Sequence, residues 1–511
     1  MSLKRDLVLM FTLLAMAAPA IARAADPEPV PTRAGETGGA IVSEQKTFTT
    51  SDGEVVSYEV GALSVHENRA DPNSRIIRVG FARFRSTGPA DGPPSFHLPG
   101  GPGSSYVAWL SDGQALSIRR VTRMLLPFRA AGDVVLIDQR GFSTRGEKLT
   151  YLERPTPAPL DRPATLEAET QAQVAAIRLG LAAYPHKDLS GYTIAACADD
   201  VDDLRQALGY SKIVLVGQSF GSQWSLAVMR RHPDIVARAI LSGVEPLNNH
   251  YDMPSHIFAS LQRLAWEADA DPRLAPWLPP GGVMAALRSV RARLARAPVR
   301  VPLIDKASGR RQVVVVGLGD FQQELLSPPA EWPAVILSLY HGHYEGLAHE
   351  ALEERARSTH PDALIGPLID TSIGVTPLRR HLLRSDPGIE FLGGWNFEGY
   401  LAATPYMPTP DMGDDFRTPV RNPTPVLFVH GDWDISTPIE NSLGLMPYFP
   451  NSHLLQVHRG GHIARADLFD RGAEVAGAIV TFARTGSFAD LPDVVSLPAP
   501  VFDLPAHPPG R

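Results

Sequence analysis

The most informative segment of the chain is KIVLVGQSFGSQWSLAVMRRHP, which runs from Lys212 to Pro233. Its apolar start predicts a buried strand, and the spacing of apolar residues after Phe220 predicts a helix. Between the two, GQSFG (217–221) fits the G-x-S-x-G pattern of a nucleophile elbow, a sharp strand-to-helix turn that presents a serine hydroxyl. Glycines flank Ser219 because such a turn leaves no room for a Cβ atom. Ser219 is therefore the predicted nucleophile.

Short apolar stretches of strand type recur along the chain and alternate with helical patterns. This alternation predicts an α/β fold, in which a mostly parallel sheet is covered by helices on both faces and carries its site at the carboxyl ends of the strands. The expected strands are EVVSYEVGAL (54–63), RIIRVGFARF (75–84), SFHL (95–98), DVVLID (133–138), KIVLV (212–216), ARAILSG (237–243), PVLFVHG (425–431) and HLLQVH (453–458).

The strand rhythm stops in the middle of the chain, where helical patterns and proline-rich breaks replace it. An insertion of that size between sheet strands predicts a mainly helical cap over the site, and a separate unrelated domain is the alternative. The expected division is a core in two parts (26–245 and 416–490), a cap (246–415) and a proline-rich C-terminal tail (491–511).

Residues 1–25 have the pattern of a secretory signal. Lys4 and Arg5 precede an apolar stretch, and Ala22-Arg23-Ala24 fits an A-x-A cleavage site. The apolar stretch is too short to span a bilayer. We expect an exported protein, periplasmic or secreted, with no membrane anchor; a segment that stays attached as an anchor is the alternative.

Charge and cysteine content exclude several function classes. The 511 residues carry a formal net charge of −7 without a basic run, which argues against nucleic acid as a partner. Cys197 is the only cysteine, so no disulfide can form within the chain, and its helical surroundings predict a buried structural thiol. We expect no metal and no cofactor.

A serine nucleophile needs a histidine to take its proton and a carboxylate to orient that histidine. On an elbow scaffold the acid follows a late strand and the histidine comes last. Asp434 lies in the loop after PVLFVHG and is the preferred acid, with Asp432 as the alternative. His462 follows Gly460-Gly461, whose backbone freedom lets the loop carry the imidazole over the elbow.

Acyl transfer also needs donors aimed at the oxyanion of the tetrahedral intermediate. The backbone N–H of Phe220, directly after the nucleophile, is one expected donor. The second is expected from the glycine-rich loop HLPGGPGSS (97–105), where Gly100 and Gly101 both offer an N–H. Gly101 is the preferred residue.

The motifs together resemble a known family. PGGPG (99–103), DQRG (138–141), the elbow GQSFG, the helix DxxDLRxxLG (200–209), GxxDxxTP (431–438) and Gly461-His462 occur in this order. They are similar to those of the proline iminopeptidase and tripeptidyl aminopeptidase family of α/β-hydrolase serine peptidases. The resemblance covers about residues 45–245 and 415–485, and it implies an α/β-hydrolase fold with a large helical cap.

The resemblance implies an aminopeptidase that releases residues or short peptides from the N-terminus of small peptides. Members of the family bind the free amino terminus with carboxylates of the cap. Glu398, in the stretch GWNFE (394–398), is the leading candidate for this role and Glu324 the second. An esterase with the same triad is the alternative enzyme, and a non-catalytic binding protein on a hydrolase fold is the alternative from another class.

Overall fold

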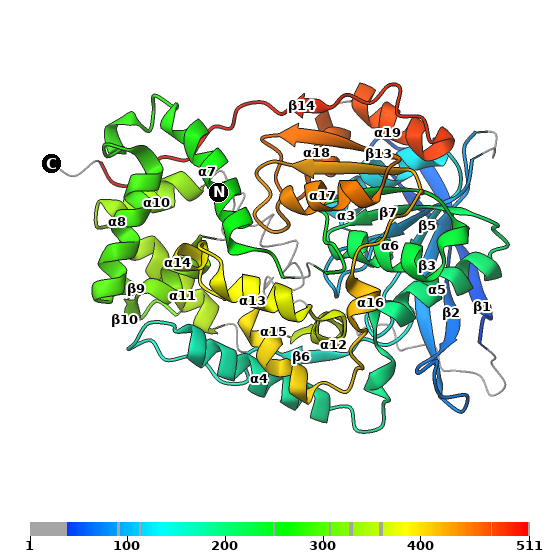
Figure 1. Cartoon of the computed structure of the whole chain (residues 1–511), viewed down its shortest axis with the longest axis horizontal. Helices are drawn as coiled ribbons and strands as arrows, with labels where there is room; N and C mark the ends of the chain where they lie inside the picture. The colour runs from blue at the N-terminus through cyan, green and yellow to red at the C-terminus, as the bar shows by residue number, and fades with distance from the viewer. Residues whose placement is uncertain are drawn as a thin grey trace.

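A mixed sheet forms the centre of the molecule in the computed structural model, at the right of the view in Figure 1. The structure describes residues 38–508, apart from 89–91, 112–113, 249–250, 306–307, 326–330, 357–360 and 472. The predicted signal, residues 1–25, lies outside the described residues.

The sheet has ten strands among the described residues, and most of them are parallel. From β5 to β14 the strands run parallel, whereas β1, β2 and β3 pair in antiparallel fashion at one edge. The predicted α/β-hydrolase fold is confirmed. In spatial order the strands are β1 (Ile41–Thr49), β2 (Val55–His66), β3 (Ile76–Phe84), β5 (Val134–Ile137), β4 (Ser95–Leu98), β7 (Ile213–Gln218), β8 (Val236–Ser242), β12 (Val426–Gly431), β13 (Ser452–His458) and β14 (Val494–Ser496).

The central strands end together at one edge of the sheet. Leu98 of β4 pairs with Gly217 of β7, and Gln218 pairs with Ser242 of β8. Ser242 in turn pairs with Val429 of β12. The loops that follow these four strands therefore meet at the same edge, where the site is expected.

Helices cover both faces of the sheet. Helices α5 (Ile194–Ala207) and α6 (Phe220–Arg231) bury one face, and α18 (Ala464–Arg471) and α19 (Ala473–Thr485) bury the other. Cys197 is fully buried in α5, as predicted. Among the described residues, none of the helices has the length and apolar character that crossing a bilayer requires.

A mainly helical cap separates β8 from β12 in the chain and has its own hydrophobic core. The short apolar stretch RQVVVV (311–316) forms β10 of an antiparallel hairpin inside it. The cap elements are α7 (Pro254–Asp269), α8 (Gly282–Arg296), β9 (Val299–Ile304), β10 (Arg311–Val316), α9 (Leu318–Glu324), α10 (Trp332–Tyr340), α11 (Glu345–Ala356), β11 (Pro361–Ala363), α12 (Ile365–Ile373), α13 (Pro377–Ser385), α14 (Ile389–Leu392), α15 (Glu398–Ala403) and α16 (Asp414–Arg417).

One segment that the sequence division places in the core lies with the cap. Strand β6 (Thr150–Leu152) pairs with β11, and α4 (Leu166–Ala182) packs against α15 along the lower side of Figure 1. Gly180 of α4 leaves room for Tyr151, since a Cβ there would lie 2.5 Å from the Tyr151 Cβ. The position of β6 and α4 depends on contacts with distant segments, which no local sequence pattern predicts.

The proline-rich tail also has defined contacts. Val494–Ser496 forms the edge strand β14, and the chain then crosses to the cap. Phe502 stacks on Trp433 in the core loop after β12, and the carbonyl of His507 accepts a 2.9 Å hydrogen bond from Nε1 of Trp277 in the cap. The tail therefore connects the core to the cap.

Candidate active site

The predicted elbow is a sharp turn between β7 and α6. Ser219 has φ 56° and ψ −129°, a positive-φ conformation that side chains rarely adopt, and it is almost fully buried. Its N–H donates to the Ser242 carbonyl at 2.9 Å, and its own carbonyl accepts from Ser222 N–H at 2.7 Å. The surrounding structure thus holds Ser219 in a strained conformation of the kind that clusters at active sites.

The flanking glycines are required by close backbone contacts. A Cβ on Gly217 would lie 2.3 Å from the Gly221 carbonyl oxygen, and a Cβ on Gly221 would lie 2.0 Å from the Leu98 carbonyl oxygen. Both distances are far inside van der Waals contact, so only glycine fits. The second contact also places the start of α6 directly against the end of β4.

The predicted acid and histidine are hydrogen-bonded neighbours. His462 Nδ1 lies 3.0 Å and 3.2 Å from the two carboxylate oxygens of Asp434, and both side chains are buried. The N–H groups of Ser436 and Thr437 each donate to Asp434 Oδ1 at 2.9 Å, and Thr437 Oγ1 donates to Oδ2 at 2.8 Å. These donors fix the orientation of the carboxylate toward the imidazole.

The histidine loop is attached to the elbow. Gln218 Nε2 donates to the His462 carbonyl at 2.8 Å, and Ser242 Oγ donates to Gln218 Oε1 at 2.6 Å. Gly243, after β8, faces the imidazole, since a Cβ there would lie 3.0 Å from His462 Cε1. The structure therefore brings the loops of Ser219, Asp434 and His462 to one edge of the sheet.

The charges of the pair are strongly coupled. Burial alone would raise the pKa of Asp434, but the positive charge of His462 and hydrogen bonds from His430 and His462 outweigh it, so this pKa lies below its usual range. Burial alone would lower the pKa of His462, but Asp434, and after it the carboxylates of Glu245 and Asp252, raise this pKa above the ordinary histidine value. Asp434 therefore stays ionised beside the histidine.

Asp432, the alternative acid, points elsewhere. Its Oδ2 lies 2.8 Å from His458 Nδ1, and its Oδ1 accepts a 2.9 Å hydrogen bond from Arg459 N–H. Asp432 and Asp434, which lie in one loop, thus contact different histidines. Asp434, the preferred residue, is the one beside His462.

The glycine-rich loop lies over the nucleophile. A Cβ on Gly100 would lie 3.6 Å from Ser219 Oγ, so the loop approaches the hydroxyl closely. Phe220 opens α6, and the first N–H groups of a helix have no partner within the helix. Gly101 has φ 111°, which favours glycine. The roles of Phe220 and Gly101 as oxyanion donors stay predictions.

Two buried carboxylates between β8 and α7, one near the nucleophile and one that affects the histidine, were missed by sequence reasoning. Glu245 Oε1 lies 3.5 Å from Ser219 Oγ. Asp252 accepts a 2.6 Å hydrogen bond from Asn441 Nδ2 and is close enough to raise the pKa of His462. Both side chains are buried. The signal was available, since Glu245 follows by three residues a strand that neighbours the elbow strand.

The two cap carboxylates that the sequence singled out lie in other surroundings. Glu398 forms a two-pronged ion pair with Arg384, whose Nε and Nη2 each lie 2.7 Å from its oxygens. Its charge is already compensated by a partly exposed arginine. Glu324 ends α9 and is buried in the cap. Glu398 is therefore a poor candidate for binding an ammonium group.

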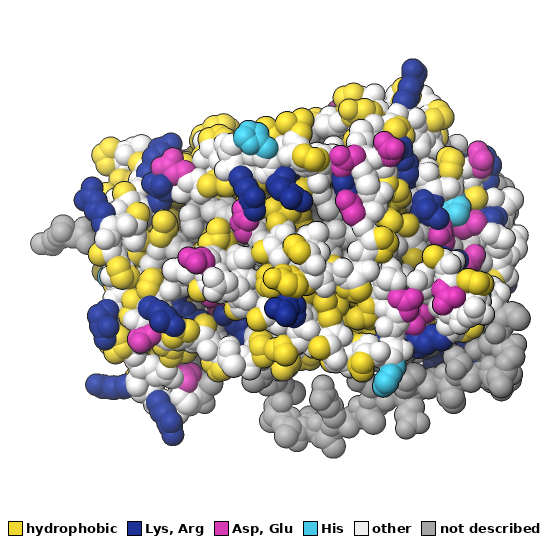
Figure 2. Space-filling model, turned by 60° about the horizontal axis from the view of Figure 1, so that its bottom comes forward, with side chains coloured by type: hydrophobic (Ala, Val, Ile, Leu, Met, Phe, Trp, Pro, Cys, Tyr) yellow, Lys and Arg dark blue, Asp and Glu magenta, His cyan; other side chains and the backbone are white. Residues whose placement is uncertain are grey.

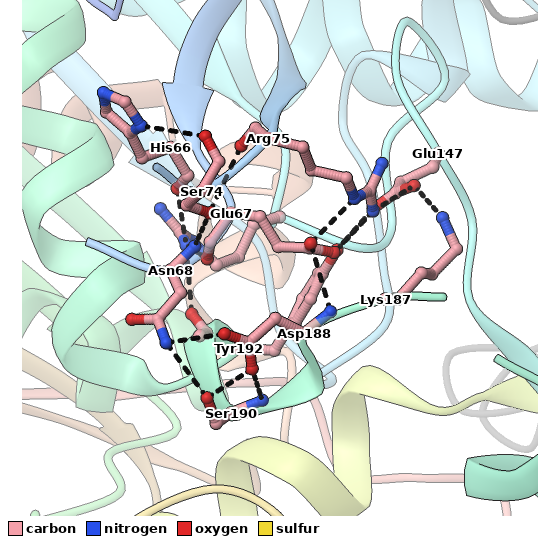
Figure 3. Close-up of polar contacts among 12 residues, drawn as sticks. His66, Glu67, Asn68, Ser74, Arg75, Glu147, Lys187, Asp188, Ser190 and Tyr192 are labelled. Carbon is pink, nitrogen blue, oxygen red and sulfur yellow. Dashed lines mark hydrogen bonds and ion pairs between the residues drawn. The ribbon is translucent and has the colours of Figure 1, made fainter. Parts of the chain in front are cut away.

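The DQRG stretch after β5 is buried and is held in place by hydrogen bonds of Arg140. Arg140 is fully buried; its guanidinium binds Asp200 of α5 and donates to the carbonyls of Glu67 and Gly191. Figure 3 shows the adjoining network, in which Arg75 joins Glu67 to Glu147. The loop that begins with DQRG is thus held at both of its ends. Tyr192 and Lys187 complete the network around Glu147.

Comparisons with known proteins agree with the fold. Residues 97–273, which run from the end of β4 past the elbow, match a family model described as the alpha/beta hydrolase fold. A comparison with curated proteins gives no match.

Solved structures similar to parts of this chain include a thermophilic esterase from Thermogutta terrifontis, at 17% identity and a TM-score of 0.33, over 83% of this chain and 98% of that one. A bromoperoxidase from Bacillus anthracis matches at 14% identity and a TM-score of 0.34, over 83% and 99%. An esterase from Exiguobacterium antarcticum matches at 12% identity and a TM-score of 0.34, over 79% and 96%. These likenesses are too distant to indicate a substrate.

The arrangement brings together the three kinds of side chain that acyl transfer by a serine uses. The hydroxyl of Ser219 lies at the helix start, and a histidine ordered by a buried aspartate is attached to the same turn. Such a histidine can take the serine proton during attack and return it to the leaving group. The carboxylate of Glu245 adds negative charge beside the hydroxyl.

Proposed function

We propose that this protein is a serine aminopeptidase that cleaves the first peptide bond of short peptides through an acyl-enzyme. The observation that carries this proposal is the carboxylate of Glu245, 3.5 Å from Ser219 Oγ. A carboxylate so close to a nucleophile suits a substrate with a positive charge beside its scissile carbonyl. The ammonium group of a free amino terminus has that charge.

The distances favour release of a single residue. Attack begins with the nucleophile about 3–3.5 Å from the carbonyl carbon, and bond geometry puts the α-nitrogen of the same residue about 2.5 Å from that carbon. A carboxylate next to Ser219 Oγ therefore reaches the amine of the first residue. Each further residue moves the amine away by about 3.3–3.6 Å, so a tripeptide amine would lie beyond its reach.

The loop that carries Glu245 is held firmly against the nucleophile helix. Glu245 N–H donates to Ser222 Oγ at 2.9 Å, and the carbonyl of Pro246 accepts from Gln223 Nε2 at 3.1 Å. Asp252 adds a second buried carboxylate, whose negative charge also raises the pKa of His462 after those of Asp434 and Glu245. An ion pair in such a buried site is stronger than one on the surface. An ester with an apolar acyl group gains nothing from these charges.

The test is a substrate panel on the wild type and on Glu245→Gln. The panel contains aminoacyl p-nitroanilides with free amines, their N-acetyl counterparts and p-nitrophenyl acetate. Loss of one charge-assisted hydrogen bond lowers kcat/KM for free-amine substrates by about 10- to 100-fold, whereas ester turnover at the pH plateau stays near the wild-type value. Glu390→Gln, which changes an ion-paired cap glutamate, is the matched control.

The outcomes separate the candidate functions. Equal cleavage of free and N-acetylated substrates by the wild type would remove the aminopeptidase proposal and favour the esterase. A fluorophosphonate probe that labels the wild type but not Ser219→Ala establishes the nucleophile. Absence of labelling and of turnover on every substrate would favour the binding-protein alternative.

We also propose that the protein is exported, on the signal pattern of residues 1–25. N-terminal sequencing of the protein purified from its own cells should find Ala25 or Asp26 as the first residue. Recovery of active protein that begins with Met1 or Ser2 would contradict export by cleavage.

A further inference from the structure

A buried side chain just after β5 forms two hydrogen bonds with the glycine-rich loop over the nucleophile. Gln139, one residue beyond Asp138 at the end of β5, is fully buried. Its Oε1 accepts a 2.7 Å hydrogen bond from Gly103 N–H, and its Nε2 donates to the Gly100 carbonyl at 3.1 Å. One amide thus bridges the two ends of the turn formed by residues 100–103.

The Gly100 carbonyl has a second donor. Ser104 Oγ donates to it at 2.6 Å. The adjoining residue is fixed as well, because Ser105 Oγ donates to the buried carboxylate of Asp138 at 2.5 Å. Two donors from different parts of the chain therefore set the direction of this one carbonyl.

The direction of that carbonyl determines the direction of the next N–H. A peptide unit is planar, and in the trans form its C=O and N–H point to opposite sides. The unit that joins Gly100 to Gly101 is trans, since the cis peptide bond among the described residues is the one that follows. The donors that fix the direction of the Gly100 carbonyl therefore also fix the Gly101 N–H, which points in the opposite direction. That N–H is the predicted second oxyanion donor.

We propose that Gln139 is a positioning residue that aims the Gly101 N–H at the oxyanion through the Gly100–Gly101 peptide plane. This inference rests on the proposed serine hydrolase function. Two consecutive glycines leave this peptide free to rotate, because glycine has no Cβ to restrict φ and ψ. An oxyanion donor is effective only when it is oriented before the reaction. The buried amide provides that orientation without touching the substrate.

The chemistry of the side chain fits this role. The turn requires one acceptor, for Gly103 N–H, and one donor, for the Gly100 carbonyl, and a carboxamide supplies both. A glutamate would put a negative oxygen against the Gly100 carbonyl. The backbone of Gln139 is itself fixed, because its carbonyl accepts from Phe142 N–H at 3.0 Å and Arg140 beside it is locked onto Asp200.

The main test compares Gln139→Met, which keeps the length and loses both hydrogen bonds, with Gln139→Glu. Loss of an oxyanion donor lowers kcat by about 100- to 1,000-fold. Because these variants misdirect the donor and do not remove it, we expect kcat on p-nitrophenyl acetate to fall by about 10- to 1,000-fold in both, while KM changes less than threefold. A boronic acid inhibitor, which forms a tetrahedral adduct with the serine, should lose affinity by a similar factor. Gln322→Met, which removes a buried cap amide bonded to Trp395, is the matched control and should keep both values.

A milder variant covers the case in which Gln139 variants do not fold. Ser104→Ala removes the other donor to the Gly100 carbonyl from a partly exposed position. It should lower kcat severalfold and weaken boronate binding equally, with an unchanged melting temperature.

The results separate this inference from the proposed function. A wild type that neither turns over the ester or the peptides nor binds the boronate would overturn the proposed function. An active wild type together with folded Gln139→Met and Ser104→Ala variants of normal kcat and boronate affinity would overturn the role of Gln139. A fall in melting temperature with unchanged kcat would assign Gln139 to stability alone and also overturn it.

Discussion

Replacement of Gly221 by alanine tests how closely the nucleophile helix approaches the loop that covers it. The new Cβ would lie 2.0 Å from the Leu98 carbonyl oxygen, 2.7 Å from the Leu98 carbonyl carbon and 2.9 Å from the Pro99 carbonyl oxygen. All three atoms belong to the backbone, so none can turn away as a flexible side chain can. Either α6 or the start of the glycine-rich loop must move.

The size of the effect follows from these distances. A carbon and a carbonyl oxygen in contact lie about 3.3–3.6 Å apart, so relief of the 2.0 Å contact with Leu98 requires a displacement of about 1.3–1.6 Å. A misplacement of about 1 Å at a catalytic site can lower the rate by about 100-fold. Overpacking costs about 1–3 kcal/mol, and the better helix propensity of alanine returns about 0.5–1 kcal/mol. The net destabilisation should therefore lie between about 0 and 2.5 kcal/mol.

The assay measures kcat on p-nitrophenyl acetate and the free energy of unfolding in urea, with Gly477→Ala as the control. Gly477 is an exposed helical glycine of α19, with nothing within 4 Å of its Cβ position. Its replacement should leave kcat unchanged and raise stability by about 0.5–1 kcal/mol. A Gly221→Ala enzyme with wild-type kcat and wild-type stability would refute the close approach.

Three further predictions concern the site and the thiol. Asp434→Asn should lower kcat by about 10⁴-fold, whereas Asp432→Asn, which faces a different histidine, should lower it far less; the reverse order would transfer the acid role. His462 must be neutral to accept the serine proton, and the negative charge of Glu245 raises its pKa. The acid limb of the pH profile of kcat/KM for an uncharged ester should therefore move to lower pH in Glu245→Gln. An acid limb at the same or a higher pH would show that Glu245 does not raise the pKa of His462. Burial raises the pKa of Cys197 to about 12, so mass spectrometry should find no alkylation by iodoacetamide at pH 8 until the protein is unfolded; rapid labelling of the native protein would contradict its burial.

The parts of the site that could be predicted are those with local signals. An apolar strand followed by a glycine-bounded serine determines the elbow, and strand-end loops in a fixed chain order point to Asp434 and His462. These features depend on a few consecutive residues. The preference for Asp434 over Asp432 came from loop length, and the structure turns Asp434 toward His462.

The parts that could not be predicted depend on contacts between distant segments. The expectation that the cap supplies the ammonium-binding carboxylate led to Glu398, but Arg384 of α13 already forms an ion pair with it. Glu245 is the exception, because its place in the core loop three residues after β8 is a local signal that the expectation of a cap carboxylate left aside. The edge strand β14 is only three residues long, so its identity as a strand depends on pairing with β13 and not on its own sequence. Similarly, α4 has no feature that assigns it to the cap.

The insertion of the cap between two paired strands has a consequence for how the chain folds. Strands β8 and β12 are neighbours in the sheet, yet paired residues such as Ala239 and Val426 are about 190 positions apart. Closing such a loop costs about 2 kcal/mol more than closing one of 20 residues, at about 0.6 kcal/mol for each doubling of length. The cap has its own apolar cluster, and ordering it first shortens the effective loop. Docking of β12, which brings Asp434 and His462 to the serine, is therefore a late step, and amide protection should appear in α8 and α10 before it appears in β12.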